Sequence, residues 1–274
     1  MDTKGKVAFI TGGGSGIGLG MAKAFLAADL RVAIADVRTD RLDRARETFV
    51  ASESKFLALE ADVTDLQSLD KAADAVEAHF GKVHIVCNNA GIGIGGLVHS
   101  ASMDQWHKIV NVNLWGVIHG CHVFTPRIQS HGEGGHIVNT ASIMGVYTSR
   151  GSGPYCATKF AVVAISECMR AELQESSIGV SVLCPFIVDT PIFYPDLDDM
   201  DTEGIERRKK QMGLMRHALS PVFVGERVLS AIQSNELYIF TDGTSSRQMI
   251  QSRIDGLNES MDRLWPVEES ASSS

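Results

Sequence analysis

The chain has 274 residues, of which 44% are hydrophobic, and its formal net charge at pH 7 is −8. This length favours one large α/β domain with a well-buried core. The acidic balance argues against a nucleic-acid or anionic-membrane partner. No apolar run approaches the roughly 18 residues of a membrane span, and residues 1–6 lack the apolar segment of a signal peptide, so we expect a cytoplasmic protein without membrane association.

Short β-rich runs alternate along the chain with longer amphipathic stretches. Strands are predicted at residues 7–10, 31–35, 55–60, 83–87, 136–140, 179–183 and 237–241. Helices are predicted at about 16–28, 40–50, 66–80, 103–130, 152–175, 225–234 and 245–264. This alternation predicts a single-domain, Rossmann-type, doubly wound and mainly parallel sheet with helices on both faces. We expect the domain to cover residues 1–267 and the polar tail 268–274 to be disordered.

Residues 190–217 interrupt this pattern with a run of acidic residues, a run of basic residues and several apolar ones. A charged run is usually a solvated face, and that interpretation stays open for the charges. The apolar residues, which include Met212 and Met215, favour a substrate lid over about 190–217.

A glycine-rich turn follows the first predicted strand. Residues 11–18 read Thr-Gly-Gly-Gly-Ser-Gly-Ile-Gly, with the spacing G-x-x-x-G-x-G instead of the better-known G-x-G-x-x-G. Glycines let the backbone approach a pyrophosphate, and the next helix offers unpaired N–H groups and the positive end of its dipole. We therefore predict a cofactor-binding turn that is made of Gly12, Ser15, Gly16, Ile17 and Gly18.

Other polar residues also follow predicted strands, where parallel sheets bind their ligands. Asp36 lies eighteen residues beyond Gly18, at the place where an acid hydrogen-bonds the adenosine ribose. Asp62 and Val63 follow the third predicted strand, although Asp62 could also be a helix N-cap together with Thr64 and Asp65. Asn89, Ser142 and Pro185 lie at the ends of later strands.

Tyr155 and Lys159 are four residues apart, with Ser142 thirteen residues before the tyrosine. On a helix this spacing places both side chains on one face, where the ammonium can lower the pKa of the phenol towards the working pH. Alcohol oxidation needs such a base, because the hydroxyl proton leaves as the carbon gives up hydride. Ser142 can hold the substrate oxygen beside the tyrosine. Alone, the Tyr-x-x-x-Lys pair is a weak signal.

Taken in order, the glycine turn, the acid at 36, Asn-Asn-Ala-Gly at 88–91, Asn113, Ser142 and the Tyr155/Lys159 pair resemble the short-chain dehydrogenase/reductase family. The resemblance runs from Lys6 to about Thr190, and more loosely to residue 241. It implies that Asn113 fixes a helix kink and a water for proton relay, and that Tyr155 and Lys159 also contact the cofactor. It further implies a cofactor site that includes Asp62, Val63, Asn89, Ala90, Gly91, Pro185, Val188 and Thr190.

One departure from the family pattern bears on the substrate. Phe186 follows Pro185 where the family usually has glycine, and we expect its ring to form part of the pocket wall. The predicted substrate residues are Ile94, Met144, Tyr147, Phe186, Phe193 and Tyr194, with Leu97, Ile143, Val146, Met212 and Met215 near them. Nearly all are apolar or aromatic, which favours a hydrophobic secondary alcohol or ketone.

The segment 235–241 and the polar helix after it look somewhat like the branch of the family that oxidises benzylic alcohols of lignin-derived aromatics. An alternative enzyme is a steroid, terpenoid or polyketide alcohol dehydrogenase with the same machinery. An alternative of another class is a nucleotide-binding regulator without turnover. The intact set of Asn113, Ser142, Tyr155 and Lys159 argues against the regulator, which has no chemical need for an activated phenol.

We expect NAD as the cofactor, because the carboxylate of Asp36 would accept a hydrogen bond from a ribose hydroxyl but repel the 2′-phosphate of NADP. Arg38, two residues further on, could relax this preference. We expect no metal site, although His119 and His122 have an i,i+3 spacing. The five cysteines form no C-x-x-C pair and are interpreted as reduced, mostly buried thiols.

A homodimer or homotetramer is predicted from the helices near 103–130 and 152–175, which the family resemblance pairs across a two-fold axis. Their outward-facing apolar positions are predicted to be Trp115, Val117, Ile118, Phe124, Val162, Ile165 and Met169.

Overall fold

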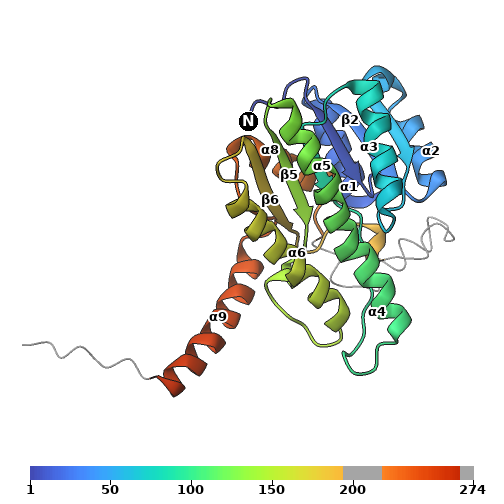
Figure 1. The fold of residues 1–274 in the computed structure, drawn as a ribbon. Helices are drawn as coiled ribbons and strands as arrows, with labels where there is room; N and C mark the ends of the chain where they lie inside the picture. Colours follow the sequence, from blue (N-terminus) through green and yellow to red (C-terminus); the bar gives the residue numbers. More distant parts are fainter. Residues whose placement is uncertain (194–217, 266–274) are drawn as a thin grey trace, which may run out of the picture.

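The computed structural model describes residues 1–193 and 218–265. These residues form one parallel sheet with the strand order β3-β2-β1-β4-β5-β6-β7 (Figure 1). The strands are β1 (Val7–Thr11), β2 (Arg31–Asp36), β3 (Phe56–Glu60), β4 (Ile85–Asn88), β5 (Gly135–Thr140), β6 (Ile178–Cys184) and β7 (Tyr238–Phe240). The predicted Rossmann-type sheet is confirmed. The domain end at 267 and the tail 268–274 lie outside the described residues and stay predictions.

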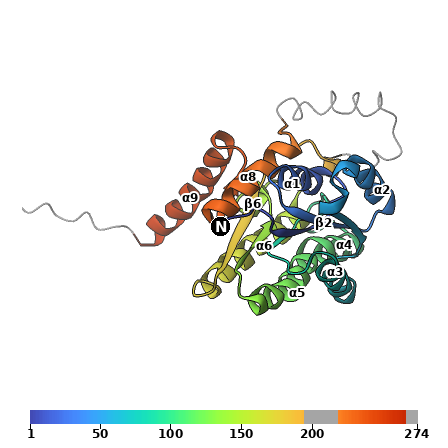
Figure 2. The ribbon, with the colours of Figure 1, turned by 90° about the horizontal axis from the view of Figure 1, so that it is seen from above.

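Helices cover both faces of the sheet, as Figure 2 shows from above. One face carries α1 (Gly16–Ala27), α2 (Thr39–Thr48) and α8 (Pro221–Ser234), and the other carries α3 (Leu66–Phe80), α5 (Gly116–His131) and α6 (Gly153–Glu172). The remaining helical elements are α4 (Met103–Val110), α9 (Thr244–Leu264), a π-helical turn η2 (Asn111–Trp115) and the 3-10 helices η1 (Val50–Lys55), η3 (Ile143–Gly145) and η4 (Pro191–Phe193).

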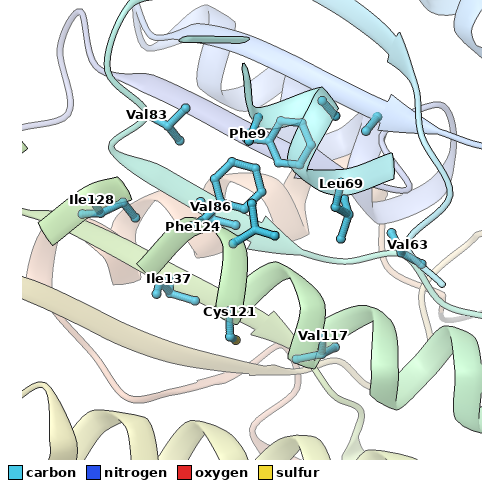
Figure 3. Close-up of a cluster of buried hydrophobic side chains, with 14 of the residues drawn as sticks. Phe9, Val63, Leu69, Val83, Val86, Val117, Cys121, Phe124, Ile128 and Ile137 are labelled. Atoms are coloured by element: carbon cyan, nitrogen blue, oxygen red, sulfur yellow. The ribbon is translucent and has the colours of Figure 1, made fainter. Parts of the chain in front are cut away.

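The strand sequences explain this layering. All five residues of β1 are buried, because both faces of the strand are covered, and side chains alternate between the two faces. Val7 and Phe9 enter the core beneath α3 and α5, whereas Ala8 and Ile10 enter the core beneath α1 and α8. In the first core the rings of Phe9 and Phe124 lie with their centroids 4.6 Å apart (Figure 3).

The prediction of which residues face outward on the long helices was wrong in part. Val117, Phe124 and Val162 are buried in the core of their own subunit, because Val117, Cys121, Phe124 and Ile128 recur at helical spacing on the side that meets the sheet (Figure 3). The other four predicted positions are not buried: Trp115 is 48% exposed, and Ile118, Ile165 and Met169 are partly exposed.

The segment predicted as a lid, 190–217, lies mostly outside the described residues, but the residues that flank it on both sides are described. Val188 and Leu219 form a parallel bridge. The amide of Asp189 donates to the Leu219 carbonyl at 3.0 Å, and the amide of Leu219 donates to the Ile187 carbonyl at 2.9 Å. The chain therefore leaves and re-enters the fold at neighbouring points.

Helices α1 and α8 cross at very short range through two glycines. An ideal Cβ on Gly20 would lie 2.1 Å from the carbonyl oxygen of Pro221, and one on Gly225 would lie 2.5 Å from the carbonyl oxygen of Gly20. Any side chain at this crossing would push the two helices apart, because its closest neighbours are backbone atoms that cannot rotate away.

We expect Gly20→Ala to destabilise the protein by about 1–3 kcal/mol or more, the range for overpacking a well-packed interior. Gly256→Ala is the matched control: an ideal Cβ at Gly256 meets nothing within 4 Å, so that change should be neutral or stabilising. Urea denaturation of both variants at one protein concentration measures the difference. Equal midpoints for the two variants would show that the crossing can relax freely.

A buried histidine links β5, β6 and the residues before β7. His136 is 1% exposed, and its Nε2 lies 2.7 Å from the Oγ of Ser181, whose hydroxyl donates to the Glu236 carbonyl. Because the serine proton is already used, Nε2 of the neutral ring is the donor in this pair. Burial, reinforced by Arg170 and the N-terminal amine, lowers the pKa of His136 to about 3.

Lowering the pH should therefore reduce the free energy of unfolding through His136. The unfolded ring takes up a proton near pH 6.5 but the folded ring does not, so stability is fully present above pH 6.5 and is lost as the pH falls towards about 3. From this group alone we expect the free energy of unfolding to fall by ~2 kcal/mol between pH 6.5 and pH 5. Denaturant titrations at both pH values should show a smaller fall in His136→Asn. His107→Asn, on the exposed face of α4, is the control, and a fall in His136→Asn as large as in that control would contradict the assignment.

Candidate active site

The predicted functional residues gather at the carboxyl edge of the sheet, around the place where the strand order reverses. β1 lies between β2 and β4, so the chain leaves β1 towards one side of the sheet and later returns to its other side. Crevices at such switch points bind ligands in open α/β sheets. Gly12 follows β1, Asn89 follows β4, Ser142 follows β5 and Pro185 follows β6.

The glycine turn is held against the loop after β4. The hydroxyl oxygen of Thr11 accepts hydrogen bonds from the amides of Asn89 and Ala90 at 2.9 and 3.0 Å, and the side-chain amide of Asn89 donates to the Thr11 carbonyl at 3.0 Å. Gly12 has a φ of +62°, and an ideal Cβ there would lie 2.8 Å from the Cα of Ala90. Only glycine fits this turn, and the loop at 89–91 fixes its position.

The helix after the turn starts directly beneath it. Ser15 is the N-cap residue of α1 but its side chain makes no capping hydrogen bond, and an ideal Cβ on Gly18 would lie 2.3 Å from the Gly12 carbonyl oxygen. Thr190 packs on the turn from the other side, 3.1 Å from an ideal Cβ at Gly16. The turn therefore presents bare backbone at a helix N-terminus, which suits an anionic pyrophosphate.

Asp36 ends β2 and is 7% exposed. Its two carboxylate oxygens accept hydrogen bonds from the amides of Gly14, at 3.1 Å, and Arg38, at 3.0 Å. The guanidinium of Arg38 forms a two-point ion pair with Asp40, at 2.8 and 3.1 Å. The carboxylate is thus fixed beside the glycine turn, while the Arg38 side chain is engaged by a neighbouring acid.

Sequence reasoning missed one residue beside the glycine turn, Arg41. Arg41 of α2 donates from Nη1 to the hydroxyl of Ser15 at 3.2 Å, so a cation reaches the turn from the next helix and not from the turn itself. The i,i+5 spacing of Asp36 and Arg41 was the only available signal for the cation.

Asp62 is exposed after β3, and its Oδ1 accepts from the amide and the hydroxyl of Thr64, each at 2.8 Å. The N-cap of α3 is Asp65, which accepts from the Gln67 amide at 2.9 Å. Of the three residues predicted to share this N-cap, Asp65 caps α3 and Asp62 does not. Val63 is buried, and its carbonyl accepts from Nδ1 of His119 at 2.9 Å.

Ser142, after β5, and Tyr155, in α6, lie close enough for the serine side chain to influence the phenol. Ser142 is 7% exposed, caps the 3-10 helix η3, and accepts from the Met144 amide at 3.2 Å. Burial raises the pKa of the Tyr155 phenol, and the neighbouring Ser142 side chain opposes that rise. The grouping of the two hydroxyls is what the sequence predicted.

The position of Lys159 corrects one expectation. Its Nζ donates to the Thr140 carbonyl at 2.8 Å and lies over the ring of Tyr155, 5.7 Å from the ring centroid. The pKa of Tyr155 is raised because burial outweighs the other influences, so the predicted lowering by Lys159 is not seen in this structure. Burial also lowers the pKa of Lys159 itself, to about 8.

Asn113 is fully buried in the π-helical turn η2, at the place where a kink was predicted. Its Oδ1 accepts from the Ile92 amide at 2.8 Å, and its Nδ2 donates to the Ile92 carbonyl at 3.0 Å. An ideal Cβ on Gly91 would lie 3.4 Å from this Oδ1 and 3.6 Å from Nζ of Lys159. Asn113, Gly91 and Lys159 are therefore contiguous, and π-turns of this kind are frequent at functional sites.

The predicted substrate residues within the described range lie in loops and short 3-10 helices that follow the strands. Ile94 follows β4, Met144 and Tyr147 follow β5, and Phe186 and Phe193 follow β6, all partly exposed. The amide of Phe186 donates to the Thr241 hydroxyl at 2.9 Å. Gly93 and Ile192 also approach each other, with 3.2 Å between an ideal Cβ and the isoleucine side chain. Tyr194, Met212 and Met215 lie outside the described residues.

The remaining expectations concern thiols, metals and membranes. Cys87, Cys121, Cys156 and Cys184 are buried, and burial raises the pKa of Cys121 to about 12; Cys168 is exposed, so it is not a core thiol. In the part of the chain that the structure describes, no three His, Cys, Asp or Glu side chains gather as metal ligands do. Nor is any helix there long and apolar enough to cross a bilayer.

The fold and the grouped serine, tyrosine and lysine define a dinucleotide-binding oxidoreductase. The family model for short chain dehydrogenases matches residues 6–201. The chain belongs to the short-chain dehydrogenase/reductase family, whose members use a nicotinamide cofactor.

Two curated relatives and one solved structure illustrate the similarity. The chain is 31% identical to 1-deoxy-11-beta-hydroxypentalenate dehydrogenase of Streptomyces avermitilis over 91% of this chain and 89% of the relative. It is 33% identical to C alpha-dehydrogenase of a Sphingobium species, over 87% of this chain and 81% of the relative. A short-chain dehydrogenase/reductase of Burkholderia phymatum, solved in complex with NAD, superposes with a TM-score of 0.86 at 30% identity, over 95% and 96% of the two chains.

Proposed function

We propose that this protein is an NAD-dependent dehydrogenase/reductase that transfers hydride between NAD and a hydrophobic secondary alcohol or ketone, a class that includes aromatic (benzylic) substrates. The observation that carries the proposal is the group of Ser142, Tyr155 and Lys159 at the carboxyl edge of the sheet, next to the glycine turn. Both relatives described above are named as dehydrogenases, one of a hydroxypentalenate and one acting at a C alpha position, which fits alcohol oxidation.

The residues around the glycine turn fit a dinucleotide. Bare backbone at Gly12 and Gly18 and the N-terminus of α1 suit the pyrophosphate, and the carboxylate of Asp36 suits a ribose hydroxyl. From the family resemblance, Val63, Asn89, Ala90, Gly91, Pro185, Val188 and Thr190 would complete the site. When bound, the nicotinamide supplies or accepts the hydride.

The side chains of this protein would handle the proton and the oxygen. Ser142 donates to the substrate oxygen and holds it beside the phenol. The Oη of Tyr155 takes the hydroxyl proton during oxidation and returns it during reduction. Lys159 holds a positive charge over the tyrosine ring and, by resemblance, contacts the cofactor ribose, while Asn113 supports the loop at Ile92 and the proton relay.

The apolar residues around the edge support the choice of substrate class. Ile94, Met144, Tyr147, Phe186 and Phe193 offer few hydrogen-bonding groups, whereas a sugar or a nucleotide would need several. The purified protein should therefore reduce NAD with a panel of secondary alcohols, followed by the absorbance of NADH. Activity with benzylic alcohols supports the aromatic class, and activity confined to steroid, terpenoid or polyketide alcohols supports the alternative. NAD binding without turnover on the whole panel would favour a nucleotide-binding regulator.

A homodimer or homotetramer remains part of the proposal. The exposed Trp115 and the partly exposed Ile118, Ile165 and Met169 provide apolar surface on η2, α5 and α6, where the family resemblance places a two-fold contact. A cytoplasmic location likewise stays a prediction from the sequence.

A further inference from the structure

Three buried polar side chains interrupt the apolar core beneath α5 and α6. Asn88 of β4, Asn139 of β5 and Ser166 of α6 are 2%, 0% and 0% exposed. The two asparagines are opposite each other in the sheet, and each lies two residues after a member of the core in Figure 3, Val86 or Ile137. Because side chains alternate along a strand, both asparagines point into this same core.

The three side chains form a chain of hydrogen bonds that runs from β4 through β5 to α6. The hydroxyl of Ser166 donates to the Val162 carbonyl at 2.7 Å, so it accepts from Nδ2 of Asn139, at 3.0 Å. Oδ1 of Asn139 then faces Asn88, whose Nδ2 donates to it at 2.9 Å. The thiol of Cys121 lies 3.4 Å from the same Nδ2. Asn139 therefore uses its amide group in two directions, towards the neighbouring strand and towards the helix.

Stability alone does not account for this chain of bonds. Within residues 1–193 and 218–265, Oδ1 of Asn88 accepts no hydrogen bond, and a Cβ added at Gly120 would overlap it. An unpaired buried acceptor costs free energy, and replacing both partners of a buried polar pair by apolar groups of the same shape can be nearly neutral or stabilising. Hydrogen bonds are directional, however, and buried polar networks specify one arrangement of a core. The bonds therefore select one position of α6.

A second polar link joins the same strand and helix nearer to the site. Lys159 donates to the Thr140 carbonyl at 2.8 Å. Thr140 is one residue after Asn139 on the strand, and Lys159 is seven residues before Ser166 on the helix. Seven residues are two helical turns, or about 10 Å. Two links at this separation fix how far α6 lies along β5 and how it is rotated.

The turn that carries Ser142 rests on the same helix. Ser142 caps η3, and an ideal Cβ on Gly145 of η3 would lie 2.7 Å from the Lys159 carbonyl oxygen and 2.9 Å from the side chain of Val163. Tyr155 belongs to α6 itself. Both hydroxyls therefore depend on where α6 lies, one through the contact of η3 and the other through the helix that bears it.

We propose that Asn139 and Ser166 are positioning residues, whose hydrogen bond sets α6 against β5 so that the hydroxyls of Ser142 and Tyr155 reach one substrate oxygen. Both act through the helix and neither is a catalytic residue. The effect on turnover rests on the proposed function, whereas the position of α6 can be measured without any substrate.

The first test removes the hydroxyl at the helix end of the bond. We expect Ser166→Ala to lose about ten- to a hundredfold in turnover, because a misplacement of roughly 1 Å can cost about 10²-fold. The Michaelis constant for the alcohol and the affinity for NAD should change little, since the residues that contact them are intact. A loss of stability without this loss of turnover would show that the bond is only structural.

The matched control is Thr125→Val on the neighbouring helix α5. The Thr125 hydroxyl donates to the Cys121 carbonyl at 2.6 Å, the same bond to the residue four positions earlier that Ser166 makes. Valine keeps the shape of threonine and removes only this hydroxyl. Turnover of the control should match that of the unmodified protein, and equal turnover of Ser166→Ala and the control would overturn the proposal.

A second variant separates position from stability. Asn88→Leu/Asn139→Leu/Ser166→Ala replaces the whole chain of bonds by apolar groups, so no polar atom of the chain is left unpaired. We expect its urea midpoint to equal or exceed that of Ser166→Ala, while its turnover stays at least as low. Recovery of the unmodified turnover in this variant would contradict the proposal.

Crystal structures of the unmodified protein, Ser166→Ala and Thr125→Val give the readout that needs no substrate. We expect α6 of Ser166→Ala to be displaced against β5 by about 0.5–1 Å, the scale on which misplacement affects turnover. The control should superpose on the unmodified protein. If the unmodified protein oxidises none of the alcohols, the proposed function fails, and this comparison still tests the positioning of α6. An α6 in the same place in all three structures would overturn the inference.

Discussion

Tyr155→Phe should bind NAD as tightly as the unmodified enzyme and lose roughly 10²–10⁴-fold or more in turnover, the range expected for a general base. The substitution removes only the phenolic oxygen, the group whose pKa the Ser142 side chain influences. The ring remains beneath Lys159, so the cofactor contacts should survive. Steady-state rates with the best alcohol of the panel, together with calorimetric titration of NAD, separate the two effects.

The matched control is Tyr238→Phe, which deletes the same atom at the edge of the sheet, where the phenol donates to Glu167 at 2.6 Å. Its turnover should stay close to that of the unmodified enzyme. Because burial raises the pKa of Tyr155, the phenolate is the minor form at neutral pH, and oxidation should accelerate as the pH rises. If Tyr155→Phe turned over at nearly the unmodified rate and its rate rose with pH in the same way, Tyr155 would not be the general base.

For the cofactor, we expect a catalytic efficiency with NAD at least about a hundredfold above that with NADP, or ~2.7 kcal/mol. The buried carboxylate of Asp36 is fixed by two backbone amides, so it cannot turn away from a 2′-phosphate. Asp36→Ala should lower the ratio of the two efficiencies, because it weakens NAD binding and removes the carboxylate that repels the 2′-phosphate of NADP. Efficiencies measured with both cofactors at one alcohol concentration test this.

Asp43→Ala, on the exposed side of α2 in an ion pair with Arg46, is the control and should leave the ratio unchanged. The two nearby arginines can then be distinguished. Arg41 already reaches Ser15 of the turn, whereas the guanidinium of Arg38 is paired with Asp40. Adding Arg41→Ala to Asp36→Ala should reduce the gained NADP activity more than adding Arg38→Ala. Equal efficiency with both cofactors in the unmodified enzyme would show that Asp36 does not govern the site.

The sequence predicted the strand and helix order because apolar periodicity and glycine turns are local signals. It also grouped Ser142, Tyr155 and Lys159, since their spacing and the ends of parallel strands bring them to one edge. Contacts between distant elements could not be read in this way. The reach of Arg41 to Ser15 and the bond from Lys159 to the Thr140 carbonyl depend on how α2 and α6 lie against the sheet.

The same limit explains the errors. Helical spacing shows that Val117, Phe124 and Val162 share apolar faces, but it does not show which face meets the sheet, and all three are core residues. The pKa of Tyr155 depends on burial in three dimensions, which outweighs the nearby lysine predicted from the i,i+4 spacing. For Asp62 and Asp65 either acid could cap α3, and hydrogen-bond geometry decided for Asp65.

The paired backbone at Val188 and Leu219 has a consequence for how this enzyme could diversify. Since Val188 and Leu219 are bridged directly, their backbones keep the same separation whatever number of residues lies between them. The entropy of closing a loop grows only slowly with loop length, by about 0.6 kcal/mol per doubling. Insertions, deletions or engineered exchange between the two residues should therefore leave the seven strands unchanged.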